Sequence, residues 1–217
     1  METLLQFSDV PVGERMSPIS FSLSGGAVSA VVTSRQHDND HLVSYLLGLS
    51  PPGGGTIHLF SQEIFPQPAG SIASLRRQVA VVFPSGGLVS NLKVWENLIL
   101  PLEYHGVWPA SVIEERGMTA LARVGYAGEL MVSPSHLTIF EKRLIGLARA
   151  MLVEPRLVIY NSLLGGLTAS EKSHLINRAL EFQQETSGRS SLFLTTNPDS
   201  LHDIPLDGCT YLKASTS

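Results

Sequence analysis

The chain has 217 residues, of which 43% are hydrophobic and 16% charged, and its formal net charge is −4. This composition is ample for one well-buried domain, and an acidic balance without an arginine-rich run argues against nucleic-acid binding. The single cysteine, Cys209, excludes an internal disulfide, fits a reducing compartment and is expected to be a small buried residue. No apolar stretch approaches the ~18 residues of a membrane-spanning helix, and the N-terminus lacks a signal-peptide pattern. We therefore expect a cytoplasmic protein.

Apolar runs and helical spacings predict a β-rich start followed by alternating helices and strands. The predicted strands are residues 4–12, 17–23, 28–32, 56–59, 79–83, 157–160 and 191–195. The predicted helices are residues 40–49, 92–104, 110–124, 141–152 and 170–186. Buried strands that alternate with helices are typical of a mostly parallel α/β sheet.

The junction after strand 28–32 has the outline of a phosphate-binding loop without its residues. The P-loop pattern G-x-x-x-x-G-K-[ST] uses glycines so that backbone N–H groups can close on phosphates, a lysine for the outer phosphates, and a hydroxyl for magnesium. These four positions hold Thr33, Asp38, Asn39 and Asp40. Two carboxylates in a poorly solvated loop repel a phosphate strongly. The loop is therefore predicted to exclude nucleotide.

Two histidines, His37 and His41, lie beside these carboxylates and suggest a metal cluster. Histidines four residues apart share a ligand face only when both are on a helix. The predicted helix begins near Asp40, which leaves His37 in the loop. We therefore expect no metal here and expect Asp38, Asn39 or Asp40 to cap the helix.

Four later segments complete a pattern that covers the chain: 83–102 (FPSGGLVSNLKVWENLILPL), 137–155 (LTIFEKRLIGLARAMLVEP), 158–167 and 192–197. With them the chain resembles the ATP-binding cassette (ABC) ATPase of membrane transporters from end to end. Its most specific part is L-A-R-A, Leu147 to Ala150, followed by Glu154 and Pro155. The run 91–98 is similar to the small cassettes of lipid- and lipoprotein-handling transporters.

The resemblance implies an α/β, P-loop NTPase-like fold with an N-terminal antiparallel β subdomain, a mostly parallel core sheet and a helical subdomain. It divides one domain into a core of about residues 1–82 and 153–217 and a helical part of about residues 83–152.

The positions to which this family assigns nucleotide chemistry hold other residues here. The Q-loop glutamine is Pro84, the Walker B pair Asp-Glu is Asn161 and Ser162, the D-loop aspartate is Thr168, and the switch histidine is Asn197. The signature L-S-G-G-Q reads Leu137, Thr138, Ile139, Phe140 and Glu141. No aromatic residue for adenine is evident in residues 11–16. The resemblance with these changes predicts a cassette that takes no cofactor and does not hydrolyse ATP.

Two further features have ordinary interpretations. Ser162 follows a strand but lacks the G-x-S-x-G elbow of a nucleophilic serine. L-S-G-G at residues 23–26 spells most of a signature motif, but it precedes the P-loop position and is expected to be a hairpin turn.

Binding remains as a function for such a cassette. In the family a permease docks near the Q-loop, and the corresponding candidates here are Phe83, Leu88, Val89, Leu92, Val94 and Trp95, which could equally pack the helical subdomain. We expect a catalytically inactive subunit of a membrane transport complex, peripheral at the inner face of the membrane and docked on a permease. The alternatives are a soluble regulator or heterodimer partner of an active ABC ATPase, a self-dimer, and a divergent active transport ATPase.

Overall fold

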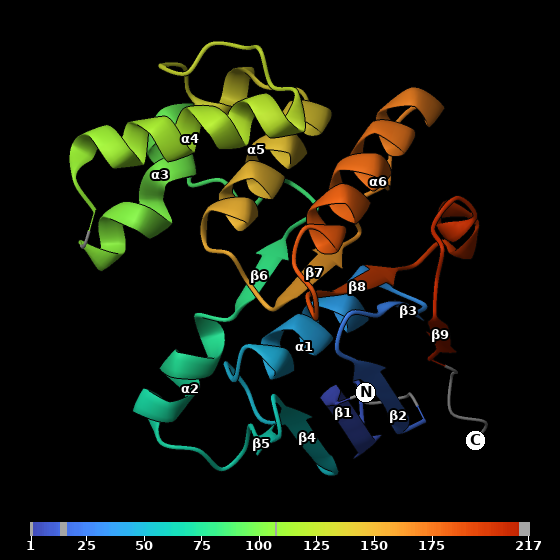
Figure 1. Cartoon of the computed structure of the whole chain (residues 1–217). Coiled ribbons are helices and arrows are strands. Elements are labelled where there is room, and N and C mark those ends of the chain that lie inside the picture. The colour runs from blue at the N-terminus through green and yellow to red at the C-terminus, as the bar shows by residue number, and fades with distance from the viewer. Residues whose placement is uncertain (1, 14–16, 107, 213–217) are drawn as a thin grey trace.

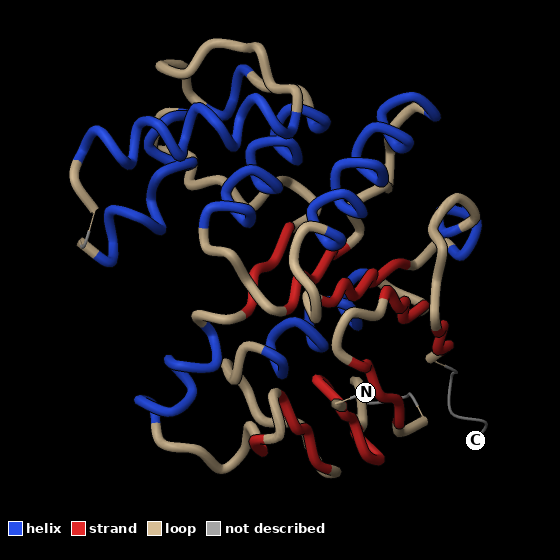
Figure 2. The backbone as a smooth tube through the Cα atoms, viewed as in Figure 1, coloured by secondary structure: helices blue, strands red, loops and turns tan. Residues whose placement is uncertain are grey.

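The computed structural model describes residues 2–13, 17–106 and 108–212. The expectation about an adenine-stacking aromatic therefore lies partly outside the described residues. Two sheets and a group of helices make up the fold (Figure 1, Figure 2). Among the described residues, no helix is both long enough and apolar enough to cross a membrane.

The N-terminal sheet is antiparallel, with strand order β2-β1-β4-β5. Its strands are β1 (Thr3–Val10), β2 (Ile19–Ser24), β4 (Thr56–Leu59) and β5 (Gln62–Glu63). Leu5 in the central strand β1 pairs with Leu23 on one side and with Leu59 on the other. All three leucines are buried, so this sheet presents one apolar face to the core.

The second sheet is parallel throughout, with order β6-β7-β8-β3-β9. Its strands are β3 (Val28–Val32), β6 (Val79–Val82), β7 (Leu157–Asn161), β8 (Ser190–Thr195) and β9 (Gly208–Tyr211). Every residue of β3, β7 and β8 is buried. Alternate residues of β7 enter different cores: Ile159 joins the one shared with the antiparallel sheet, and Tyr160 joins the one shared with the helices. Burial on both faces explains the unbroken apolar runs in the sequence.

The helices take different places around these sheets (Figure 1). They are α1 (Gln36–Leu46), α2 (Ala69–Arg76), α3 (Val94–His105), α4 (Ala110–Val124), α5 (Ile139–Leu152) and α6 (Ala169–Gln184), with short 3-10 turns at Pro134–His136 and Pro198–Leu201. α1 packs between the two sheets, whereas α3, α4 and α5 gather beyond the parallel sheet, far from the antiparallel one. The division into a core and a helical subdomain stays a prediction about how the chain is organised.

Three expectations about local structure were wrong, and one helix had no prediction. α1 begins at Gln36 rather than near Asp40, and its N-cap is Arg35, which makes no side-chain capping bond. No element was predicted where α2 lies. Gly25 and Gly26 join β2 of one sheet to β3 of the other, so they form no hairpin. Cys209 is exposed on β9, which is an edge strand and buries little.

Candidate functional site

The carboxyl ends of three parallel strands meet at the start of α1. Val32 of β3 pairs with Thr195 of β8, and Asn161 of β7 pairs with Leu194. The segments after β3 and β7 therefore lie on either side of the end of β8, and side-chain hydrogen bonds join them. In open α/β sheets this edge is where ligands bind.

Asn39, at the position the resemblance assigns to the P-loop lysine, has both ends of its amide occupied. Its side chain is 0% exposed. The Thr33 hydroxyl donates to Asn39 Oδ1 at 2.7 Å, and Asn39 Nδ2 donates to Ser162 Oγ at 3.2 Å. The amide thus joins the loop after β3 and α1 to the loop after β7 through its oxygen and one of its N–H groups.

A second group of bonds continues from Ser162. Its hydroxyl donates to Gln36 Oε1 at 2.5 Å, and Gln36 Nε2 donates to Asn161 Oδ1 at 2.9 Å. Asp40 Oδ1 accepts from both Gln36 Nε2 (3.0 Å) and Asn161 Nδ2 (2.9 Å). We call the six side chains of Thr33, Gln36, Asn39, Asp40, Asn161 and Ser162 the polar network.

Asp38 differs from the network residues because its carboxylate faces an arginine. The carboxylate is fully buried, and Arg35 Nη2 lies 3.3 Å from Asp38 Oδ1. Asp38 Oδ2 has no hydrogen-bond partner among the described residues. None of Asp38, Asn39 and Asp40 caps α1, because all three lie inside its first turns and bond to other parts of the fold or to Arg35.

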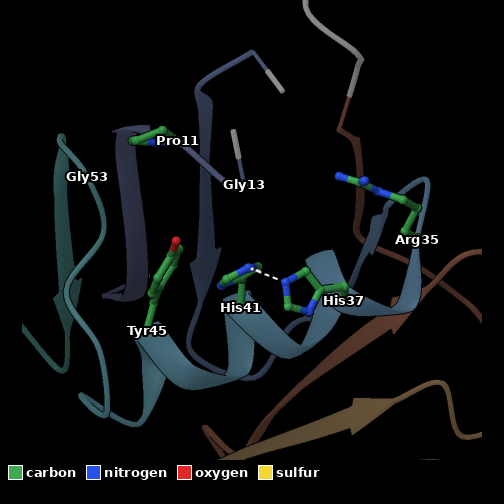
Figure 3. Close-up of a pocket in the computed structure, with 7 residues that line it drawn as sticks. All are labelled: Pro11, Gly13, Arg35, His37, His41, Tyr45 and Gly53. Atoms are coloured by element: carbon green, nitrogen blue, oxygen red, sulfur yellow. Dashed lines mark hydrogen bonds between the residues drawn. The ribbon is translucent and has the colours of Figure 1, made fainter. Parts of the chain in front are cut away.

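A cavity of about 620 Å³ lies between α1, the segment after β1 and the turn before β4. It is lined by Pro11, Gly13, Arg35, His37, His41, Tyr45 and Gly53 (Figure 3). His37, His41 and Tyr45 project from successive turns of α1 toward this cavity. The His37 and His41 Nε2 atoms are 2.9 Å apart, so His37 is on the helix and the expectation that it lies in the loop was wrong. Burial raises the pKa of Tyr45.

Side chains of the signature segment cap the N-terminus of α5. Thr138 is the N-cap, and its hydroxyl accepts from the Glu141 N–H. Glu141 Oε2 accepts from Thr138 N at 2.7 Å and from Thr138 Oγ1 at 2.8 Å, which completes a capping box. Ile139 is exposed, and the Phe140 ring packs edge-on against His174.

The remaining positions that the resemblance singled out have local bonds. The Pro84 carbonyl accepts from Arg143 Nε at 2.8 Å. Thr168 caps α6 in a second capping box, and its hydrogen bonds lower the pKa of Glu171. Asn197 Oδ1 accepts from the N–H of Asp199 and caps the following 3-10 turn.

The docking candidates separate into buried and accessible residues. Val94 is fully buried in the core and cannot contact a partner, so its inclusion was wrong. Phe83 and Leu88 are partly buried against the core, Leu92 is half-buried, and Val89 is exposed.

Trp95 lies in an apolar groove of about 440 Å³. The groove is lined by Trp95, Ile99, Glu103, Ala110, Ile113, Glu114, Met118, Leu130 and Met131. The Trp95 ring packs against α4 at Gly117. A Cβ atom at position 117 would lie only 2.7 Å from the ring, so a larger residue there would require the ring to move. Exposed Met118 and Met131 add to its apolar lining.

Sequence reasoning missed Gln36, Arg35 and Tyr45 as site residues. Gln36 and Asp40 are four residues apart, a spacing that places them on one helix face, but a helix predicted to begin at Asp40 hides it.

The two sheets, the helices beyond them and the P-loop-like junction at the strand ends define an α/β fold of the P-loop NTPase class. A sequence model of the ABC transporter family matches residues 41–161, more than half of the chain, and the chain belongs to that family. The match starts immediately after Asp40, so it leaves out the loop that precedes it.

Curated relatives are ATP-binding proteins of transport systems. The methionine import ATP-binding protein MetN 1 of Acinetobacter baylyi is 25% identical over 170 residues, which are 78% of this chain and 48% of that protein. The lipoprotein-releasing system ATP-binding protein LolD of Hydrogenovibrio crunogenus is 29% identical over 189 residues, which are 87% of this chain and 79% of that protein. The chain thus spans about half the length of the methionine import relative.

Two solved structures share the fold. CbiO1 from Clostridium perfringens, part of the ABC transporter complex CbiONQ, superposes with a TM-score of 0.81 at 19% identity, covering 98% of this chain and 86% of that one. The dimeric bacterial ABC transporter cassette MJ0796 gives a TM-score of 0.83 at 16% identity, covering 96% and 94%. The predicted family and fold class are confirmed.

Proposed function

We propose that this chain is a subunit of an ABC membrane transport complex that docks on a permease and does not hydrolyse ATP. The observation that carries the proposal is the polar network. Its amides, hydroxyls and Asp40 carboxylate bond to one another where the resemblance places the phosphates and magnesium of a nucleotide.

Phosphoryl transfer depends on charge neutralisation, magnesium binding and orientation of the attacking nucleophile acting together. Asn39 offers no cation in place of the lysine, and Asn161 and Ser162 offer an amide and a hydroxyl in place of two carboxylates. Nucleotide entry would also disturb the bonds that Asn39 makes to Thr33 and Ser162, and a buried polar group that loses its partner is costly. Loss of one such catalytic group lowers the rate of an enzyme by orders of magnitude, and here the residues at three catalytic positions differ together.

Calorimetric titration with Mg-ATP, accompanied by a phosphate-release assay, tests this part of the proposal. We expect neither saturable heat nor turnover for the natural chain. The matched control is a variant in which the loop is rebuilt as a P-loop: Thr33→Gly, Asp38→Gly, Asn39→Lys and Asp40→Ser. Heat in the rebuilt variant alone would show that the assay detects binding. Micromolar affinity of the natural chain would overturn the claim that its site is closed to phosphate, and turnover would establish a divergent active ATPase.

The groove beside Trp95 supports docking. It is apolar, and Glu103 and Glu114 are the charged residues in its lining. A short amphipathic helix with apolar residues on one face and a basic edge fits a groove of this character. The relatives MetN 1 and LolD are named for import and release systems, and we assign this chain a place of the same kind: cytoplasmic and peripheral at the inner face of a membrane.

A second candidate function is a regulator that pairs with an active cassette. The α5 N-terminus favours it, because it would meet a partner's nucleotide with the exposed side chain of Ile139 and with Thr138 and Glu141 already bonded to each other in a capping box. Purification of the tagged chain from solubilised membranes of its host, followed by mass spectrometry, separates the two. A permease as the main partner supports docking. An intact cassette as the main partner, without a permease, supports the regulator.

A further inference from the structure

We infer that His37 and His41 form a binding site for a divalent transition-metal ion of the imidazole-preferring kind, open to the cavity beside α1. The inference rests on the two imidazoles and the cavity they line. It does not depend on the proposed loss of ATP hydrolysis.

The distance between the two imidazole nitrogens matches metal coordination. The Nε2 atoms of His37 and His41 are 2.9 Å apart, one helical turn from each other on α1. With metal–nitrogen bonds of about 2.0–2.1 Å, two nitrogens at right angles on one ion lie about 2.9 Å apart, and two at a tetrahedral angle about 3.3 Å. The observed distance therefore fits the tetragonal geometry of Ni²⁺ or Cu²⁺, and Zn²⁺ needs an opening of a few tenths of an ångström.

The rings can turn to accept an ion without moving the helix. Their planes are inclined at 67°, and the side-chain χ2 torsion of histidine is soft. In the neutral pair, one Nε2–H donates to the other Nε2. Metal binding replaces this bond when that proton moves to Nδ1 of the same ring, so both Nε2 lone pairs face the ion.

The surroundings leave the remaining coordination positions to solvent or a small ligand. No group of three potential ligand side chains occurs among the described residues, so the protein supplies two imidazoles. Tyr45 lies next along the helix, with its ring centroid 5.8 Å from that of His41. Arg35 also lines the cavity, but its guanidinium is paired with the Asp38 carboxylate, which lessens repulsion of a cation. His37 is exposed and His41 half-buried, so an ion reaches both from the cavity.

The test is a titration of the full chain with Ni²⁺, followed by thermal unfolding. The protein must carry no polyhistidine tag and have the Cys209→Ser background, because both the tag and the thiol bind the same ions. At a Ni²⁺ concentration one hundred times the Kd we expect the Tm to rise by roughly 5–10 °C. We expect His37→Gln and His41→Gln each to abolish the rise, while the matched control His202→Gln, an exposed histidine in the 3-10 turn region, keeps it.

Calorimetry of the same samples gives the stoichiometry, and one ion per chain that is lost in both variants supports the site. The inference is overturned if the parent shows no saturable rise in Tm. It is also overturned if the rise survives in either His37→Gln or His41→Gln. Neither side chain is buried in a core, so circular dichroism of the metal-free variants should match that of the parent.

Discussion

At the scale of single residues, the site is built from polar groups whose partners lie far away in the sequence. Asn39 bonds to Ser162, 123 residues further along the chain, and Gln36 bonds to Asn161. A buried polar group costs about 1–3 kcal/mol when its partner is removed, whereas a satisfied hydrogen bond contributes only about 1 kcal/mol. The network is therefore most sensitive to the loss of its buried members, Thr33, Asn39 and Asn161.

Replacing Asn39 with alanine should lower the free energy of unfolding by about 1–3 kcal/mol, because Ser162 Oγ loses a donor and Thr33 Oγ1 loses an acceptor. Urea unfolding of the variant measures the change. Asn177→Ala, at an exposed position of α6, is the matched control and should change stability by less than about 0.5 kcal/mol. An Asn39→Ala protein as stable as the parent would mean that the amide is not paired as described.

At the scale of elements, the buried side chain of Arg143 fixes α5 against two loops. Arg143 is 4% exposed. Its Nε donates to the Pro84 carbonyl at 2.8 Å, after β6, and its Nη1 donates to the Gly165 carbonyl at 2.7 Å, after β7. Burial lowers the pKa of Arg143, but a guanidinium remains charged at neutral pH. One residue thus joins the helical part of the chain to both central loops.

We expect Arg143→Met to cost about 3 kcal/mol of unfolding free energy, because methionine keeps much of the stem but leaves two carbonyls without a donor. Arg143→Lys should restore little of this stability, since a single ammonium group cannot donate to both carbonyls as the planar guanidinium does. The comparison is Arg178→Ala, which removes a surface ion pair with Glu181 and should cost less than about 1 kcal/mol. Guanidinium chloride unfolding gives all three values, and equal losses for Arg143→Met and Arg178→Ala would contradict this role.

Much of the order of the elements could be predicted because it follows from local patterns. The buried runs of β3, β7 and β8 and the spacing of α4 point to strands and helix from sequence alone, and their ends differ from expectation by one residue at most. The start of α1 could not be predicted in this way. Asp38, Asn39 and Asp40 have the composition of a cap, and only their bonds to Arg35, Thr33 and the loop after β7 place them inside the helix.

The positions of some site residues could also be predicted from local patterns, but their contacts could not. The residues at the P-loop and Walker B positions follow from their place after β3 and β7. The hydrogen bonds between these residues could not be predicted from the sequence. Asn, Gln, Ser and Asp side chains that lie more than 100 residues apart show no regular spacing that would indicate a contact. Val94 shows the opposite error: an apolar residue next to Trp95 looked accessible, but the helix turns it into the core.

At the scale of the whole molecule, accessible apolar surface is concentrated in the helical part. The groove between α3, α4 and the loop before Pro134 is lined by exposed Met118 and Met131. Methionine adapts its shape to apolar partners, and exposed apolar surface of this kind marks interaction sites. The polar network faces another part of the fold, at the carboxyl edge of the parallel sheet, so the proposed docking and the proposed loss of ATP hydrolysis can be tested separately.

Met131→Glu should release the chain from its membrane complex without lowering its stability. Met131 is 67% exposed, so a carboxylate there stays hydrated in the free protein but loses its water when a partner covers the groove. Leu49→Glu is the matched control, because Leu49 is 63% exposed and lies after α1, outside the groove. The fraction of tagged chain recovered with membranes, measured beside the unfolding midpoint of each variant, gives the answer. We expect at least a tenfold loss for Met131→Glu, which corresponds to about 1.4 kcal/mol of binding, and none for Leu49→Glu. Retention of both variants at the parent level would place the docking surface elsewhere and would leave the groove as a feature of the fold alone.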